Sequence, residues 1–145
     1  MNKLEVERDD GVENTPRRKC MNIKVMIVDD HKMFRDGLRG LINAEPGMEV
    51  VGEAVDGREA IEKARKLSPD VVIMDISMPG MNGIEAMRHL IKDRPQVKVI
   101  MLSMYASGPL VQSVLAAGAT EYVMKGADFS DLSAAIRRAC GLPER

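Results

Sequence analysis

Five side chains that could do chemistry each follow an apolar run of the sequence. Asp29 and Asp30 follow the run IKVMIV, and Asp75 follows VVIM. Ser103 follows VKVIML, and Lys125 follows EYVM. Taken alone, each of these residues is more often a turn residue, a helix cap or a solvated side chain. Because all five recur at the same kind of position, we interpret them together as one site.

Three carboxylates that share a site require a cation nearby. Two carboxylates about 4 Å apart repel by roughly 4 kcal/mol at an effective dielectric of ~20. Lys125 offsets one charge, and a hard divalent ion with oxygen ligands, Mg²⁺ rather than zinc or copper, would offset the rest. A carboxylate placed there can attack phosphorus and form an acyl phosphate, with the lysine and the metal stabilising the transferring group. These residue types therefore indicate phosphoryl chemistry.

An alternation of strands and helices would position these residues. Apolar, β-branched runs predict buried strands at 23–28 and 71–74. Three further strands are expected at 48–54, 97–102 and 121–124. Helical spacing of apolar residues predicts helices at 32–43, 57–67, 82–93, 110–117 and 129–140. Asp56 and Asp128 are expected to cap the second and the last of these helices. Leu41 is among the apolar residues that align along the helix at 32–43. Helical crossovers make the strands parallel, so the prediction is an α/β doubly wound sheet. Ligands then bind beyond the carboxyl ends of the strands.

Composition narrows the class of protein. The 145 residues carry 21 basic and 22 acidic side chains, a net charge of −1, which argues against a nucleic-acid surface based on bulk charge. No stretch of 18 apolar residues occurs, so we expect no membrane span, and the charged N-terminus favours a cytoplasmic protein over an exported one. We interpret residues 1–20 as a flexible extension, 21–141 as the folded domain and 142–145 as a tail or the start of a linker. The cysteines, Cys20 and Cys140, are expected to be reduced thiols at the end of the sheet opposite the site.

Four separated motifs resemble the receiver domain of two-component response regulators. They are VMIVDDHKMFRDGL, VVIMDISMPGMNGIEAM, VIMLSM and AAGATEYVMKGAD, and they span about 21–140 in the expected order. The segments DDH and MDISMPGMNG look closest to the NarL/FixJ (LuxR-type) branch. The resemblance implies a flavodoxin-like (βα)5 fold with strand order 2-1-3-4-5.

The resemblance also implies a role for each residue of the expected site. Asp75 corresponds to the phosphoacceptor, Asp30 to a direct Mg²⁺ ligand, and Asp29 to the acid that holds a metal-bound water. The backbone carbonyl of Ser77 corresponds to the third protein ligand beside Asp30 and Asp75. Lys125 corresponds to the lysine that pairs with the phosphoryl group.

The same resemblance implies a conformational switch and a set of partners. Ser103 corresponds to the switch hydroxyl and Tyr122 to the switch aromatic. A sensor histidine kinase would donate the phosphoryl group, the receiver would catalyse its own phosphotransfer and slow dephosphorylation, and a homodimer could form on phosphorylation. DNA would be reached only through an output domain that this chain lacks. Gly126 stands where many receivers have proline, and the residues Ser77 and Tyr105 leave the phosphoryl lifetime open.

Three other functions stay open at the level of the sequence. A phosphate-ester hydrolase with Asp75 as nucleophile would usually carry a second acid where Ser77 stands. A flavin carrier would need a Ser/Thr/Gly phosphate loop where the segment 29–31 reads DDH. A pseudo-receiver that only docks is disfavoured by the intact acids. We interpret His31 as a helix-start residue rather than a metal ligand, and the segment 78–81 as loop packing rather than a copper site.

Overall fold

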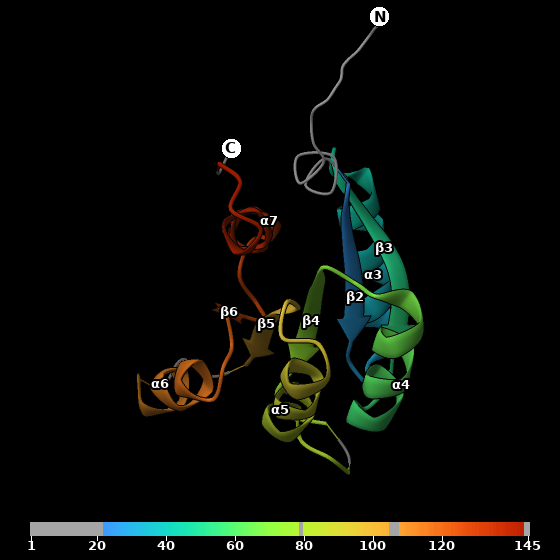
Figure 1. The fold of residues 1–145 in the computed structure, drawn as a ribbon. Coiled ribbons are helices and arrows are strands. Elements are labelled where there is room, and N and C mark those ends of the chain that lie inside the picture. The colour runs from blue at the N-terminus through green and yellow to red at the C-terminus, as the bar shows by residue number, and fades with distance from the viewer. Residues whose placement is uncertain (1–21, 79, 105–107, 144–145) are drawn as a thin grey trace, which may run out of the picture.

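The fold is described by a computed structural model that places residues 22–78, 80–104 and 108–143. Five strands and five helices alternate along this part of the chain (Figure 1). The strands are β2 (Ile23–Val28), β3 (Met48–Ala54), β4 (Val71–Asp75), β5 (Lys98–Ser103) and β6 (Glu121–Met124). The helices are α3 (Lys32–Ala44), α4 (Gly57–Leu67), α5 (Gly83–Asp93), α6 (Gly108–Ala116) and α7 (Phe129–Ala139). Every predicted element is present, and its bounds lie within two residues of those expected.

The five strands form one parallel sheet in the order β3-β2-β4-β5-β6. In chain order this is 2-1-3-4-5, so the predicted flavodoxin-like topology is confirmed. The order reverses at β2, whose neighbours are β3 on one side and β4 on the other. Sites of doubly wound sheets form at such a switch point, beyond the carboxyl ends of the strands.

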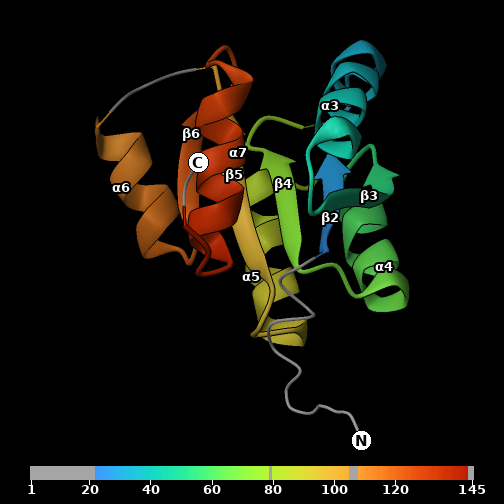
Figure 2. The same cartoon turned by 90° about the horizontal axis from the view of Figure 1, so that it is seen from above.

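Helices cover both faces of the sheet, as the apolar strands require. One apolar cluster joins the sheet to α4, α5 and α6, and a second joins the opposite face to α3 and α7. Figure 2 shows α7 and α5 on opposite sides of the strands. The alternation of the two faces is clear along β2, where Met26 belongs to the first cluster while Val25 and Ile27 belong to the second. The central strands are therefore held rigidly beneath the residues that follow them.

Local sequence signals set the ends of two helices beside the site. At α4, the side chain of Asp56 accepts a hydrogen bond from the backbone N–H of Glu59, and the Glu59 carboxylate accepts one from Val55, both at 2.8 Å. At α5, Asn82 accepts from the N–H of Glu85 at 2.9 Å. The bonds from Glu59 and Glu85 satisfy N–H groups that a helix leaves without internal partners, and the bond from Val55 ties the preceding residue to the first turn of α4. The predicted cap at Asp56 is confirmed.

Two details of the predicted helices are wrong. Asp128 precedes α7 as expected, but its side chain makes no capping hydrogen bond. Leu41 does not face the core, because Leu38 and Ile42, one turn apart, take the buried stripe of α3. Leu41 is instead 50% exposed and lines a groove beside α7.

Several expectations concern the remaining ends and loops. Cys140 lies at the amino end of the sheet, beside Ile23, which is the end opposite the predicted site. Met78 is buried, and Met81 packs against the same cluster, which supports the loop-packing interpretation. Among the described residues no helix is long and apolar enough to cross a membrane. The extension 1–20 with Cys20, and also Pro79 and Tyr105, lie outside the described residues.

Candidate phosphoacceptor and metal site

The chemistry-bearing residues meet at the carboxyl edge of the sheet. Asp29 and Asp30 follow β2 directly, while Asp75 ends β4 and Ser103 ends β5. Parallel register aligns these ends, because Val28 pairs with Met74 and Ser103 pairs with Met124. Lys125 comes immediately after Met124, at the end of β6. The structure therefore places these five residues at one edge of the sheet, where the sequence predicts them.

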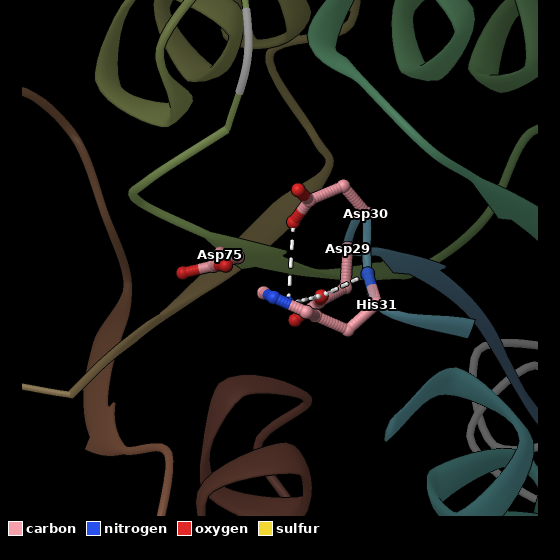
Figure 3. Close-up of side chains that lie close together, drawn as sticks. All are labelled: Asp29, Asp30, His31 and Asp75. Carbon is pink, nitrogen blue, oxygen red and sulfur yellow. Dashed lines mark hydrogen bonds and ion pairs between the residues drawn. The ribbon is translucent and has the colours of Figure 1, made fainter. Parts of the chain in front are cut away.

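The acids lie against one another and are mostly buried. Asp29 is fully buried and Asp75 is 4% exposed, whereas the side chain of Asp30 keeps 31% exposure. Asp29, Asp30, His31 and Asp75 each offer one ligand atom, and these four atoms all lie within 4.8 Å of one another (Figure 3). Burial raises the pKa of Asp75, and the nearby Asp29 carboxylate adds to this rise, while Lys125 opposes it. The cluster therefore holds negative charge that its surroundings do not fully stabilise.

Lys125 is the cation of this site, and it lies closer to Asp29 than to Asp75. Its Nζ is 2.7 Å from Oδ2 of Asp29 and 3.3 Å from Oδ2 of Asp75. Burial alone would lower the pKa of Lys125, but the two carboxylates outweigh it, so the pKa lies above its ordinary value. The Phe34 ring of α3 lies beneath the ammonium, with its centroid 4.6 Å from Nζ, a cation–π contact. The lysine is thus held charged and oriented toward both carboxylates.

The remaining predicted residues surround this centre at different depths. Ser103 is buried, and its backbone carbonyl accepts from the N–H of Lys125 at 2.8 Å, which joins the ends of β5 and β6. Ser77 donates its backbone N–H to Oδ1 of Asp75 at 3.3 Å. Tyr122 is partly buried and packs against the cluster on the α4–α5–α6 face, at a position paired with Met101. Ser103 thus ends β5, the strand between β4 and β6. Ser77 follows β4, two residues after Asp75, and Tyr122 lies on β6, three residues before Lys125.

Three contacts at the site were not predicted from the sequence. His31 starts α3 as predicted, yet its ring also faces the acids, with Nδ1 3.0 Å from Oδ1 of Asp29 and 3.3 Å from Oδ1 of Asp30. Arg35, one turn later, donates from Nη1 to the backbone carbonyl of Asp29 at 2.7 Å. Phe34 lies under Lys125. The spacing of these residues along α3 was visible in the sequence, but the directions of their side chains were not.

The donor set fits a divalent cation. Three carboxylates and one ammonium give this cluster a formal charge of about −2 with His31 neutral. Oxygen ligands dominate, and no cysteine is among them. Carboxylates so close together are stabilised when a cation joins them. The acidic cluster is therefore compatible with metal binding.

Comparison with known proteins assigns the family. A family model described as the response regulator receiver domain matches residues 25–137. The chain belongs to this family. The receiver domain is 42% identical over 115 residues to the response regulator GacA of Pseudomonas syringae, an alignment covering 79% of this chain and 54% of GacA. The chain thus spans about half the length of the curated relatives it matches.

Solved structures agree with this assignment. A LuxR-family two-component response regulator from Aurantimonas has a TM-score of 0.78 and 36% identity, covering 83% of this chain and 87% of that one. The signal receiver domain of the response regulator NarL from Mycobacterium tuberculosis has a TM-score of 0.77 and 27% identity, covering 83% and 97%. The similarity to the NarL-like, LuxR-type branch is therefore confirmed. As a receiver domain, the chain is a signalling switch, which favours this interpretation over the hydrolase and the flavin carrier.

Proposed function

We propose that this receiver domain accepts a phosphoryl group on Asp75 from a sensor histidine kinase. The observation that carries the proposal is the surroundings of Asp75, a buried carboxylate at the end of a central strand. Its Oδ2 is 3.3 Å from the Lys125 ammonium, and the acids after β2 lie beside it. A nucleophile held next to a fixed cation and a metal-compatible cluster is suited to phosphoryl transfer.

We assign the metal site to Mg²⁺. Asp30 and Asp75 would ligate it through their carboxylates, Ser77 through its backbone carbonyl, and Asp29 through a bound water. Mg²⁺ bound in this way supplies positive charge for the phosphoryl oxygens and leaves positions for them in its coordination shell. The donor set supports this assignment, because the cluster is rich in oxygen and carries an excess of negative charge.

In the transfer step, a carboxylate oxygen of Asp75 forms a bond to phosphorus as the bond from phosphorus to the kinase histidine breaks. The histidine keeps the electron pair and takes up a proton. Lys125 is already 3.3 Å from Asp75, so its ammonium can pair with the phosphoryl oxygens without crossing the site. The domain in this way catalyses its own phosphotransfer and, with water as the attacking group, its slow dephosphorylation.

The switch would follow from the new charge on Asp75. The buried hydroxyl of Ser103 would turn to donate a hydrogen bond to the phosphoryl group, and Tyr122 would move inward into the space released. Two states that differ in affinity for the phosphoryl group suffice for such a response. We propose that the protein acts in the cytoplasm, that phosphorylation can lead to a homodimer, and that transcription is controlled through a DNA-binding output domain.

The deciding experiment is intact mass after incubation with acetyl phosphate and Mg²⁺. We expect a gain of one phosphoryl group that EDTA prevents and that Asp75→Asn abolishes. Glu62→Gln, which makes the same carboxylate-to-amide change on the exposed face of α4, should label like the unmodified protein. Labelling that persists in Asp75→Asn would refute the assignment of the phosphoacceptor. No labelling of the unmodified protein by acetyl phosphate or by a kinase phosphohistidine would indicate a pseudo-receiver that only docks.

A further inference from the structure

The ring of His31 points into the acidic cluster but has no part in the function proposed above. Its Nδ1 lies 3.0 Å from Oδ1 of Asp29 and 3.3 Å from Oδ1 of Asp30 (Figure 3). The backbone N–H of the same residue donates to Oδ1 of Asp29 at 2.8 Å, which ties the start of α3 to this carboxylate. The imidazole is thus fixed at the rim of the site, with its side chain 65% exposed.

The spacing of these atoms is that of neighbouring ligands around a single ion. Adjacent ligands of an octahedral ion with bonds of about 2.1 Å lie about 3 Å apart, and opposite ligands lie about 4.2 Å apart. The distances from His31 Nδ1 to the two carboxylate oxygens, 3.0 and 3.3 Å, are those of a hydrogen bond and an ion pair, and they are also compatible with the adjacent spacing. All four candidate ligand atoms, including one from Asp75, fall within 4.8 Å of one another. One nitrogen and three oxygens can therefore enter the same coordination shell after small side-chain movements.

A nitrogen in this shell changes which ions the site prefers. Mg²⁺ favours oxygen ligands, whereas imidazole nitrogen raises the affinity for divalent ions of the first transition series. We infer that Nδ1 of His31 ligates a divalent transition-metal ion bound by the carboxylates of Asp29, Asp30 and Asp75. This inference rests on the proposed function, since it uses the same metal centre, with Asp29 bound to the transition-metal ion directly instead of through a water. It adds a protein ligand that discriminates transition ions from Mg²⁺.

Binding in this way has a defined cost. Nδ1 must present its lone pair, so the ring proton is carried by Nε2 in the bound form. The Lys125 ammonium lies 3.4 Å from Nδ1 and would be repelled by the ion. It retains carboxylate partners in Oδ2 of Asp29 and Oδ2 of Asp75, so it need not become unpaired. The ion and the lysine can share the cluster because their nearest carboxylate oxygens differ on Asp29.

The test uses Mn²⁺ as the probe and the full chain. Pulsed electron paramagnetic resonance detects hyperfine coupling from a nitrogen bound directly to Mn²⁺, and isotope labelling of histidine identifies its source. We expect nitrogen coupling in the unmodified protein, its loss in His31→Ala and its retention in His89→Ala. His89 is the other histidine of the chain and lies exposed on α5, which makes it a matched control. By calorimetry, His31→Ala should weaken Ni²⁺ binding by roughly tenfold or more, and Mg²⁺ binding much less.

The outcomes separate this inference from the function on which it rests. Bound Mn²⁺ without histidine nitrogen coupling in the unmodified protein would overturn the role of His31, whether or not the variants fold. If the same protein still labels with acetyl phosphate and Mg²⁺, the proposed function survives that result. No binding of any divalent ion and no labelling would overturn both. Equal weakening of Ni²⁺ and Mg²⁺ in His31→Ala would indicate a structural role for the residue and would also overturn the inference.

Discussion

Replacing Asp75 by asparagine should make the metal-free domain more stable as well as inactive. The residue is 4% exposed, and burial raises the pKa of its side chain, with the Asp29 carboxylate adding to the rise. A raised pKa means that the folded protein favours the neutral carboxyl group. The ionised form is therefore a destabilising element at neutral pH, and an amide of the same shape removes it.

The expected gain follows from opposing contributions. The candidate ligand atoms of the acids lie within 4.8 Å of one another. At that limit and an effective dielectric of ~20, repulsion between Asp75 and a second carboxylate is about 3 to 4 kcal/mol. Two such neighbours, Asp29 and the partly solvated Asp30, together give about 5 kcal/mol after screening of the latter. The attraction between Asp75 and the Lys125 ammonium, 3.3 Å away, stabilises the ionised carboxylate by about 5 kcal/mol. These contributions nearly cancel, which leaves the desolvation of a buried carboxylate, and we expect Asp75→Asn to raise the free energy of unfolding by about 2 kcal/mol.

The difference in the free energy of unfolding can be measured by urea denaturation in EDTA, at values from about pH 4 to about pH 8. Because the unfolded carboxyl group ionises before the folded one as pH rises, the destabilisation by Asp75 grows through the raised pKa and is complete above it. The advantage of Asp75→Asn should therefore be largest near neutral pH and shrink toward acid. Mg²⁺ should stabilise the unmodified protein more than the variant. Glu62→Gln, an exposed control, should change stability by less than about 0.5 kcal/mol. A variant no more stable than the unmodified protein at neutral pH would refute the reasoning.

Two further substitutions test how the site is supported. At Gly83, a Cβ would lie 2.4 Å from the backbone carbonyl oxygen of Asp75. Gly83→Ala should therefore push α5 away from β4 and lower the free energy of unfolding by about 2 kcal/mol. Urea denaturation measures this loss, and an unchanged midpoint would contradict the close approach. Phe34→Leu removes the ring under Lys125, so it should lower the free energy of unfolding by about 1 kcal/mol and slow labelling by acetyl phosphate. Phe34→Tyr retains the ring and should retain both properties. Equal behaviour of the two variants would contradict a contribution from the cation–π contact.

The sequence alone was sufficient to predict the fold and the position of the site. The strands β4 and β5 are short and mostly apolar, and a polar residue at the end of each is conspicuous, so Asp75 and Ser103 can be placed without coordinates. Side-chain direction could not be predicted in this way. That Lys125 lies nearer Asp29 than Asp75, or that His31 faces the acids, depends on rotamers and on packing between elements distant in sequence. Leu41 failed for a related reason, because periodicity does not say how wide the buried stripe of a helix is.

The sheet supports the two halves of the site unequally. β2, which leads to the acids, is paired on both sides, with β3 and with β4. β6, the strand of Tyr122 that leads to Lys125, is four residues long and pairs only with β5 among the described residues. Local opening takes place where few hydrogen bonds and contacts must be lost. The acids after β2 thus lie at the end of an interior strand, while Lys125 and Tyr122 lie on or next to the edge strand β6. This edge strand can open locally without unfolding of the whole domain. A change of state can therefore be confined to the edge of the domain.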